Sequence, residues 1–183
     1  MSASAPLSRR LWPARARALR APEAIAGLGG LGVFVSAVLT WLHYESDAPL
    51  CTGAAGCRTV NTSPYSEVMG VPVAALGLLM YAAILGLSLL ARRSYSATPV
   101  LAASSRKHRP RPKPVQPAPF YRPAALAIFG LALAGLLYSS YLTYLEVNVI
   151  HALCPWCLAS QGIIAAIFVL SLPMAIRASA RPH

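Results

Sequence analysis

Charged residues are scarce in this chain, and acidic residues are the scarcest of all. Only 11% of its 183 residues are Asp, Glu, Lys or Arg, and only five are acidic. Apolar residues make up 56% of the sequence, and the mean hydropathy is +0.55. A soluble domain carries about 25% charged residues. The composition therefore excludes an ordinary soluble domain and predicts a bundle of membrane helices.

Lysine and arginine are absent from four long apolar runs, which cover residues 24–42, 72–91, 124–145 and 154–176. Each run is long enough to cross about 30 Å of hydrocarbon as a helix. The first run is too long for the apolar part of a secretion signal. No small residue directly precedes Cys51 to form a lipid-attachment site. We therefore predict an all-α integral membrane protein with a four-transmembrane-helix bundle, its first run retained as a span.

Basic residues are almost missing from two of the connections between these runs. Fifteen of the 16 Lys and Arg residues precede the first run, separate the second from the third, or follow the fourth. Such residues stay on the cytoplasmic side. We expect cytoplasmic tails at residues 1–23 and 177–183 and a membrane domain at residues 24–176, with an extended or disordered Pro/Arg-rich inner loop at residues 92–123. The prediction is a multi-pass inner-membrane protein with both termini cytoplasmic.

The net charge of +11 raises the question of nucleic-acid binding. The basic residues cluster in a tail and a loop without interleaved aromatic residues, so no nucleic-acid partner is expected. Attraction to anionic membrane lipid explains the charge.

The longer outer connection carries the signals of a short helix. Ser63 and Pro64 suit the N-cap and the first helical position. Glu67 suits the positive end of the helix, and Gly70 suits its end. We expect a short interfacial helix over residues 63–70, lying as a lid over the mouth of the bundle.

Cysteine is rare too, and all four cysteines fall within or directly after the two outer connections. Cys51 and Cys57 are separated by five small residues, whereas Cys154 and Cys157 belong to the sequence Cys-Pro-Trp-Cys that opens the fourth run. Outside the cytoplasm, paired thiols can hold disulfides. Cys154 stands where an N-cap belongs, so the helix dipole is expected to stabilise its thiolate. Cys157 lies one turn deeper, where an apolar electron acceptor can approach.

Other roles for these cysteines were weighed against redox chemistry. Haem attachment requires a histidine after the second cysteine, where this chain has Leu158. A structural four-cysteine zinc site and two inert disulfides remain open alternatives. A thiol-ligand metal transporter is a further alternative, although no cysteine lies on the cytoplasmic side to continue such a path. No metal is needed for a thiol relay.

The combination of motifs along the chain resembles the bacterial thiol oxidase branch of the vitamin K epoxide reductase family. The resemblance covers residues 33–91 and 136–167. It is carried by Cys51 and Cys57, Val60 and Ser63, Gly70-Val71-Pro72, Gly77 and Tyr81, and Cys154-Pro155-Trp156-Cys157.

This resemblance implies that the protein is a membrane oxidoreductase and that its four-helix bundle surrounds a quinone. The quinone would be either ubiquinone or menaquinone. Electrons would come from a thioredoxin-like protein and support disulfide formation outside the cytoplasm. Cys51 would meet that partner, Cys57 would exchange with Cys154, and Cys157 would lie next to the quinone ring. The sequence up to His183 contains no thioredoxin-like domain, so we expect the partner to be a separate protein.

Four residues are predicted to contact the quinone, namely Ser63, Tyr81, Tyr141 and Gln161. Vertebrate members of the family have a tyrosine at the position of Gln161, which makes vitamin K epoxide a doubtful substrate here. For Tyr138, Tyr141 and Tyr144 an aromatic belt at the interface is the default expectation, with a quinone-lining role as the alternative. The polar residues at span ends, His43, Glu146 and His151, are expected to be solvated.

Overall fold

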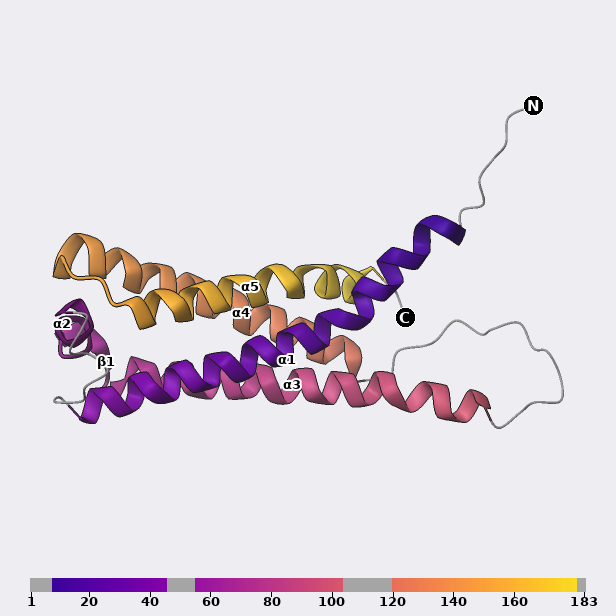
Figure 1. Cartoon of the computed structure of the whole chain (residues 1–183), viewed down its shortest axis with the longest axis horizontal. Coiled ribbons are helices and arrows are strands. Elements are labelled where there is room, and N and C mark those ends of the chain that lie inside the picture. The colour runs from indigo at the N-terminus through magenta and orange to yellow at the C-terminus, as the bar shows by residue number, and fades with distance from the viewer. Residues whose placement is uncertain (1–7, 46–54, 104–119, 181–183) are drawn as a thin grey trace, which may run out of the picture.

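Four long helices form the molecule, which we describe from a computed structural model covering residues 8–45, 55–103 and 120–180. The helices are α1 (Ser8–Tyr44), α3 (Val73–Ala103), α4 (Tyr121–Leu145) and α5 (Pro155–Ser179) (Figure 1). Each contains a segment long and apolar enough to cross a membrane. The prediction of an all-α, four-helix membrane bundle is confirmed.

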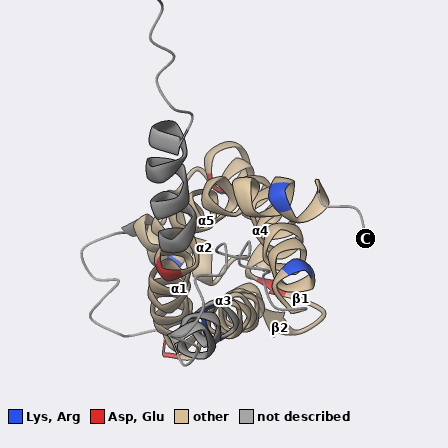
Figure 2. Ribbon diagram, turned by 90° about the vertical axis from the view of Figure 1, so that its right-hand side faces the viewer, with Lys and Arg blue, Asp and Glu red and all other residues tan. Residues whose placement is uncertain are grey.

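The helices close into a bundle in which each has two neighbours. Helix α1 packs along α3 and α5, and α4 packs along α5 and α3. Viewed along the bundle, the four helices surround a common axis, and positions coloured for Lys or Arg appear at the near ends of α4 and α5 (Figure 2). The basic residues of α4 and α5 therefore lie at the end of the bundle where the fourth span finishes.

Two glycines allow neighbouring helices to approach closely. A Cβ atom on Gly32 of α1 would lie 2.6 Å from Cγ of Tyr81 on α3, so a side chain there would displace the ring. On α4, a Cβ atom on Gly135 would lie 2.6 Å from the sulfur of Met80. Small residues at such crossings are typical of membrane helices, because packing holds these helices together.

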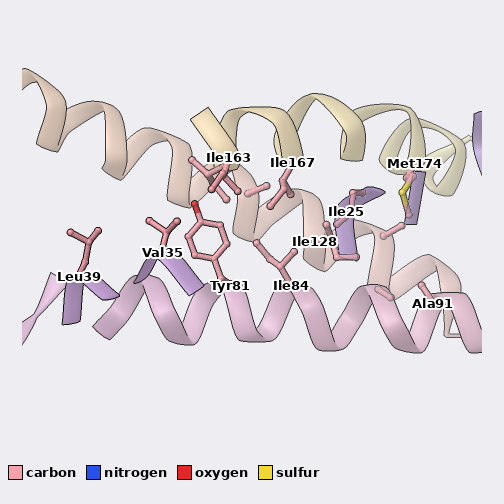
Figure 3. Packing of buried hydrophobic residues seen from close by; sticks show 14 of the residues in the cluster. Ile25, Val35, Leu39, Tyr81, Ile84, Ala91, Ile128, Ile163, Ile167 and Met174 are labelled. Atoms are coloured by element: carbon pink, nitrogen blue, oxygen red, sulfur yellow. The ribbon is translucent and has the colours of Figure 1, made fainter. Parts of the chain in front are cut away.

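Branched aliphatic side chains from all four helices fill the interior between these crossings. Figure 3 shows Tyr81 reaching from α3 across this interior toward Ile163 of α5. The fully buried aliphatic residues are Ile25 of α1, Ile84 of α3, Ile128 of α4 and Ile164 and Ile167 of α5.

A small substructure, which we call the outer lid (residues 55–72), covers one end of the bundle. It contains helix α2 (Ala55–Asn61), a 3₁₀ turn η2 (Pro64–Ser66) and a hairpin of β1 (Glu67–Val68) and β2 (Val71–Pro72). The lid lies at the end where α4 connects to α5, opposite the start of α1 and the end of α5 (Figure 1).

The helix expected over residues 63–70 is confirmed only at its start, where Ser63 and Pro64 open the 3₁₀ turn η2. Its expected extent is wrong, because the hairpin begins at Glu67. Ser63 has the extended backbone of an N-cap, but its hydroxyl donates to the carbonyl of Val60 instead of capping a helix. Met69 and Gly70 both have positive φ, at 55° and 79°, which reverses the chain. Glu67 then pairs with Pro72 across the hairpin.

The helices also extend beyond the expected spans. Helix α1 begins at Ser8, within the predicted N-terminal tail, and α3 continues to Ala103. The prediction that the inner loop is extended is thus wrong for residues 92–103. Alanine, leucine and arginine are strong helix formers and favour continuation of a helix past the apolar span. Residues 121–123, at the end of that loop, are also helical because α4 begins at Tyr121, and residues 104–119 lie outside the described residues.

Candidate functional site

The Cys-Pro-Trp-Cys motif begins α5 as its sequence predicts. Cys154 is the N-cap with φ −101° and ψ 110°, and Pro155 begins the helix. The Cys154 sulfur accepts the backbone N–H of Cys157 at 3.4 Å. Both cysteines are free thiols, and Cys154 is fully buried while Cys157 is partly buried. The N-cap position of the first cysteine is therefore confirmed.

This position activates Cys154. The hydrogen bond from the Cys157 thiol is the largest influence and lowers the pKa of Cys154, assisted by the backbone N–H groups of Cys157 and Trp156. Burial and the nearby Glu146 carboxylate act in the opposite direction without reversing the result. Hydrogen bonds to a thiolate stabilise the charged form. Cys154 is accordingly the thiol of the pair that deprotonates first.

Of the two outer-loop cysteines, Cys57 is described and Cys51 lies outside the described residues. Cys57 sits on α2, is completely buried and is disulfide-bonded. Neither Cys154 nor Cys157 is its partner, because both are free. The structure thus combines an oxidised Cys57 with a reduced pair at the start of α5.

The lid packs directly on the chain that leads into this pair. A Cβ atom on Gly56 would collide with the carbonyl oxygen of Leu153 and lie 2.9 Å from its carbonyl carbon and amide nitrogen. Gly56 precedes Cys57, and Leu153 precedes Cys154. Because residue 56 has no side chain, the two segments that carry these cysteines can touch.

Beside Cys157 lies a cavity of about 440 Å³ between the helices and under the lid. Its wall is mostly apolar and comes from α1, α3, α4, α5 and the lid. Ligand pockets have volumes of roughly 300–1,000 Å³ and combine apolar walls with a few polar groups. The cavity therefore suits a flat, largely apolar molecule with a polar edge, placed against the Cys157 thiol.

The predicted quinone-contacting residues fall into two groups. Ser63 and Tyr81 line the cavity. The Tyr81 hydroxyl donates to the backbone carbonyl of Ser160 at 2.8 Å, which fixes the ring between α3 and α5. Tyr141 is 53% exposed and Gln161 accepts a hydrogen bond from Thr143, and neither belongs to the cavity wall. The structure brings the first two to the cavity and leaves the other two beside it.

Among the three tyrosines near the outer end of α4, the structure separates one from the others. Tyr138 lines the cavity, whereas Tyr141 and Tyr144 are half-exposed or more on the outside of the bundle. Tyr141 and Tyr144 thus lie where an aromatic belt at the interface is expected, and Tyr138 lies where a cavity-lining role requires it.

Glu146 is the residue whose role the sequence reasoning missed. It was expected to be solvated, which is wrong, because its relative exposure is only 2%. One carboxylate oxygen accepts the backbone N–H of Cys154 at 3.1 Å, and the residue lines the cavity. The available signal was its place at the end of an apolar span, since ionisable residues within membrane helices are usually functional.

His43 joins the end of α1 to the lid. One ring nitrogen lies 3.1 Å from the carbonyl oxygen of Asn61, and the other lies 3.1 Å from a carboxylate oxygen of Glu67. The His43 side chain is only 11% exposed, so it is less solvated than expected, whereas Glu67 is 50% exposed. His151 is exposed, as expected of a residue in the outer connection.

The zinc alternative requires a cluster of ligands. Within residues 8–45, 55–103 and 120–180, no three His, Cys, Asp or Glu side chains are grouped so as to hold a metal ion. A four-cysteine site would also need Cys51, which lies outside these ranges.

Comparison with protein families adds an independent finding. A family model described as "Vitamin K epoxide reductase family" matches residues 23–172. The match covers most of the chain and includes the second and third spans, most of the first and fourth, the outer lid and the four cysteines.

Proposed function

The chain belongs to the vitamin K epoxide reductase family, whose members are membrane thiol–disulfide oxidoreductases, and from this premise we propose that it is a thiol:quinone oxidoreductase. It takes electrons from a thioredoxin-like protein outside the cytoplasm and reduces ubiquinone or menaquinone. One observation carries the proposal: a free cysteine pair opens α5, with the Cys157 side beside an apolar cavity and the Cys154 side against the lid.

The residues of the cavity fit a quinone head group. The wall is apolar enough for a ring and an isoprenoid tail, and the Cys157 thiol and the Tyr81 hydroxyl supply polar groups at its inner edge. A bound quinone supplies a two-electron acceptor that no side chain provides. The protein's part is to hold the thiols against it and to keep water out.

The outer pair passes electrons inward by thiol exchange. A thiolate of the partner attacks a disulfide between Cys51 and Cys57, and the partner's second thiol completes its own disulfide, which leaves Cys51 and Cys57 reduced. Cys57 then attacks Cys154 of an inner disulfide and releases Cys157 as a thiolate. Cys51 attacks Cys57 in turn and releases Cys154, so the inner pair becomes the dithiol and the outer pair the disulfide.

The oxidation states in the structure suit the last part of this cycle. Cys57 is disulfide-bonded while Cys154 and Cys157 are free, and the cycle includes a state with this bonding. The lowered pKa of Cys154 raises the share of its thiolate above that of an ordinary cysteine. Closing the inner disulfide then sends two electrons to the quinone.

Cysteine variants in a quinone-reduction assay test this proposal. Purified protein in detergent is given either a reduced thioredoxin-like donor or a small dithiol, and the quinone absorbance is followed. Cys154→Ala and Cys157→Ala should abolish reduction with both donors, because each removes the inner pair. Cys57→Ala should abolish it with the protein donor and spare it with the dithiol. Ser179→Ala, at the far end of α5, serves as the unaffected control.

Trapped disulfides provide the second readout. With Cys51→Ala, mass spectrometry after an acid quench should find a bridge between Cys57 and Cys154, because the resolving thiol is missing. Full dithiol-driven turnover by Cys157→Ala would contradict the electron path. Absence of the Cys57–Cys154 bridge, together with about one zinc ion per chain, would favour the structural zinc site instead.

A further inference from the structure

The carboxyl group of Glu146 is a buried acid with no basic partner among the residues whose side chains are described. It opens the π-helical turn η3 (Glu146–Ile150) that ends the third span. Removing a carboxylate from water is costly unless other groups compensate, so such a residue needs a reason to persist. Single π-helical turns are themselves frequent at functional sites.

The backbone holds this carboxyl group over the cysteine pair. The carbonyl of Glu146 accepts the N–H of Ala152 at 3.0 Å and also the N–H of His151, whose φ of 54° turns the chain toward α5. One carboxylate oxygen accepts the N–H of Cys154 at 3.1 Å. The Cys157 thiol interacts with the same carboxyl group. Both cysteines are therefore tied to one acid.

The chemistry of the inner pair requires a proton acceptor at this place. The Cys154 sulfur accepts the backbone N–H of Cys157 at 3.4 Å, which favours a thiolate at Cys154 and leaves Cys157 as the thiol that still carries its proton. The remaining thiol, Cys157, must lose its proton when the disulfide closes. It lies in an apolar cavity where water is a poor acceptor, and Glu146 lines the same cavity.

We propose that Glu146 accepts the Cys157 proton as the Cys154–Cys157 disulfide forms, and that it thereby acts as the general base of the quinone step. This inference rests on the proposed function. As the S–S bond forms, the S–H bond of Cys157 breaks and its proton goes to the Glu146 carboxylate. The two electrons go to the quinone, which takes up two protons in total, one returned by Glu146 and one from solvent.

A purely structural role predicts a different behaviour. As a structural residue, Glu146 would only accept the Cys154 N–H, and glutamine could replace it because the amide oxygen also accepts hydrogen bonds. Glutamine cannot take up a proton at neutral pH. Other titratable groups near the site are Cys154 and Cys157 on α5 and three tyrosines of the cavity wall, Tyr65, Tyr81 and Tyr138. Helix α2, which packs against η3, adds Arg58. Substitution of Glu146 changes none of them.

The test is a single-turnover experiment with pre-reduced protein and a water-soluble ubiquinone analogue, repeated across pH. Wild type establishes that quinone is reduced at all. Glu146→Gln should be about 100-fold slower at pH 7, the lower range for loss of a general base. The difference in rate between wild type and Glu146→Gln should shrink as pH rises, because hydroxide replaces the missing base. Added formate should partly restore Glu146→Ala, whose shortened side chain leaves room for a small acid.

Two controls separate the outcomes. Glu45→Gln makes the same change at an exposed carboxyl on the outer side and should keep the wild-type rate. Thermal unfolding and the count of alkylated thiols show whether Glu146→Gln is folded. Wild type inactive toward quinone overturns the proposed function itself. If wild type is active and Glu146→Gln is equally fast, the role of Glu146 alone is overturned. The same conclusion holds if Glu146→Gln is slowed by the same factor at every pH and formate does not rescue Glu146→Ala.

Discussion

The side chain of residue 56 is a single hydrogen atom, and the packing of α2 against Leu153 depends on it. Cys57 follows directly on the same helix, so its distance from the Cys154 segment is set by this contact. Thiol–disulfide exchange between cysteines requires the attacking sulfur to reach a sulfur of the disulfide along the S–S axis. At the scale of single residues, the absence of a side chain at Gly56 thus lets the segments that carry Cys57 and Cys154 touch.

We predict that Gly56→Ala slows turnover driven by a thioredoxin-like donor by roughly 10- to 100-fold. A displacement of reacting groups by about 1 Å can lower a reaction rate by about 100-fold. The added methyl group would press on the backbone of Leu153, which cannot move aside as a flexible side chain would. Quinone reduction driven by a small dithiol should stay near wild type. Both rates are measured from quinone absorbance.

A matched glycine supplies the control for this substitution. A Cβ atom on Gly27 of α1 meets no atom within 4 Å, so Gly27→Ala should leave both rates unchanged. Equal loss with both donors in Gly56→Ala would mean that the bundle, rather than the lid contact, was damaged. Unchanged turnover with the protein donor would show that the contact at Leu153 does not govern exchange.

At the scale of elements, the outer lid is a short structure that depends on its neighbours. Helix α2 has only seven residues and the hairpin strands have two each. Such elements are not stable alone in water. The lid is held by Gly56 against Leu153 and by His43, which ties Asn61 and Glu67 to the end of α1.

We predict that His43→Ala loosens the lid without unfolding the bundle. One net hydrogen bond is worth about 1 kcal/mol, which corresponds to roughly fivefold faster local opening. The ion pair with half-exposed Glu67 adds little because solvent screens it. Hydrogen–deuterium exchange followed by mass spectrometry should therefore show faster exchange in peptides from residues 55–72 and unchanged exchange in α4.

Removal of an ion pair at the other end of the bundle controls for general loosening. Glu23 and Arg92 are exposed and lie 3.4 Å apart. Glu23→Ala should leave exchange in residues 55–72 unaffected. If His43→Ala also left it unaffected, or accelerated exchange throughout the bundle, the histidine would not be the tie between α1 and the lid.

At the scale of the whole molecule, the bundle has two chemically different ends. The lid and the Cys154–Cys157 pair lie at one end, while Arg122 at the start of α4 and Arg177 near the end of α5 lie at the other (Figure 1). Basic residues flanking spans favour the cytoplasmic side. The thiol end is then expected to face the compartment in which disulfides persist.

We predict that the lid end faces outward in the cell membrane. In a background with the four native cysteines replaced by serine, Thr62→Cys and Ser179→Cys each add one exposed thiol at opposite ends. A membrane-impermeant maleimide should label the Thr62→Cys variant in intact cells and the Ser179→Cys variant only after permeabilisation. Labelling of position 179 in intact cells would invert the orientation and place the thiols in a reducing compartment.

The sequence by itself determined the membrane class, the four spans and the N-cap at Cys154. These features are local, since the length of an apolar run and the chemistry of one helix start depend on a few consecutive residues. The same reasoning placed Ser63 and Pro64 correctly at the start of a helical turn but extended that helix too far along the chain. Pairing of Glu67 with Pro72 and positive φ at Met69 and Gly70 prevailed over the cap signal of Ser63.

Only the tertiary structure decided how the cysteine site is built. Burial of Glu146 against Cys154, contact of Gly56 with Leu153 and the choice of Tyr138 rather than Tyr141 for the cavity wall all join different elements. No local pattern marks such contacts, because each arises from the way helices pack and close a shared space. A polar residue at the end of a span can face water or the interior, and packing of the neighbouring chain turned Glu146 inward.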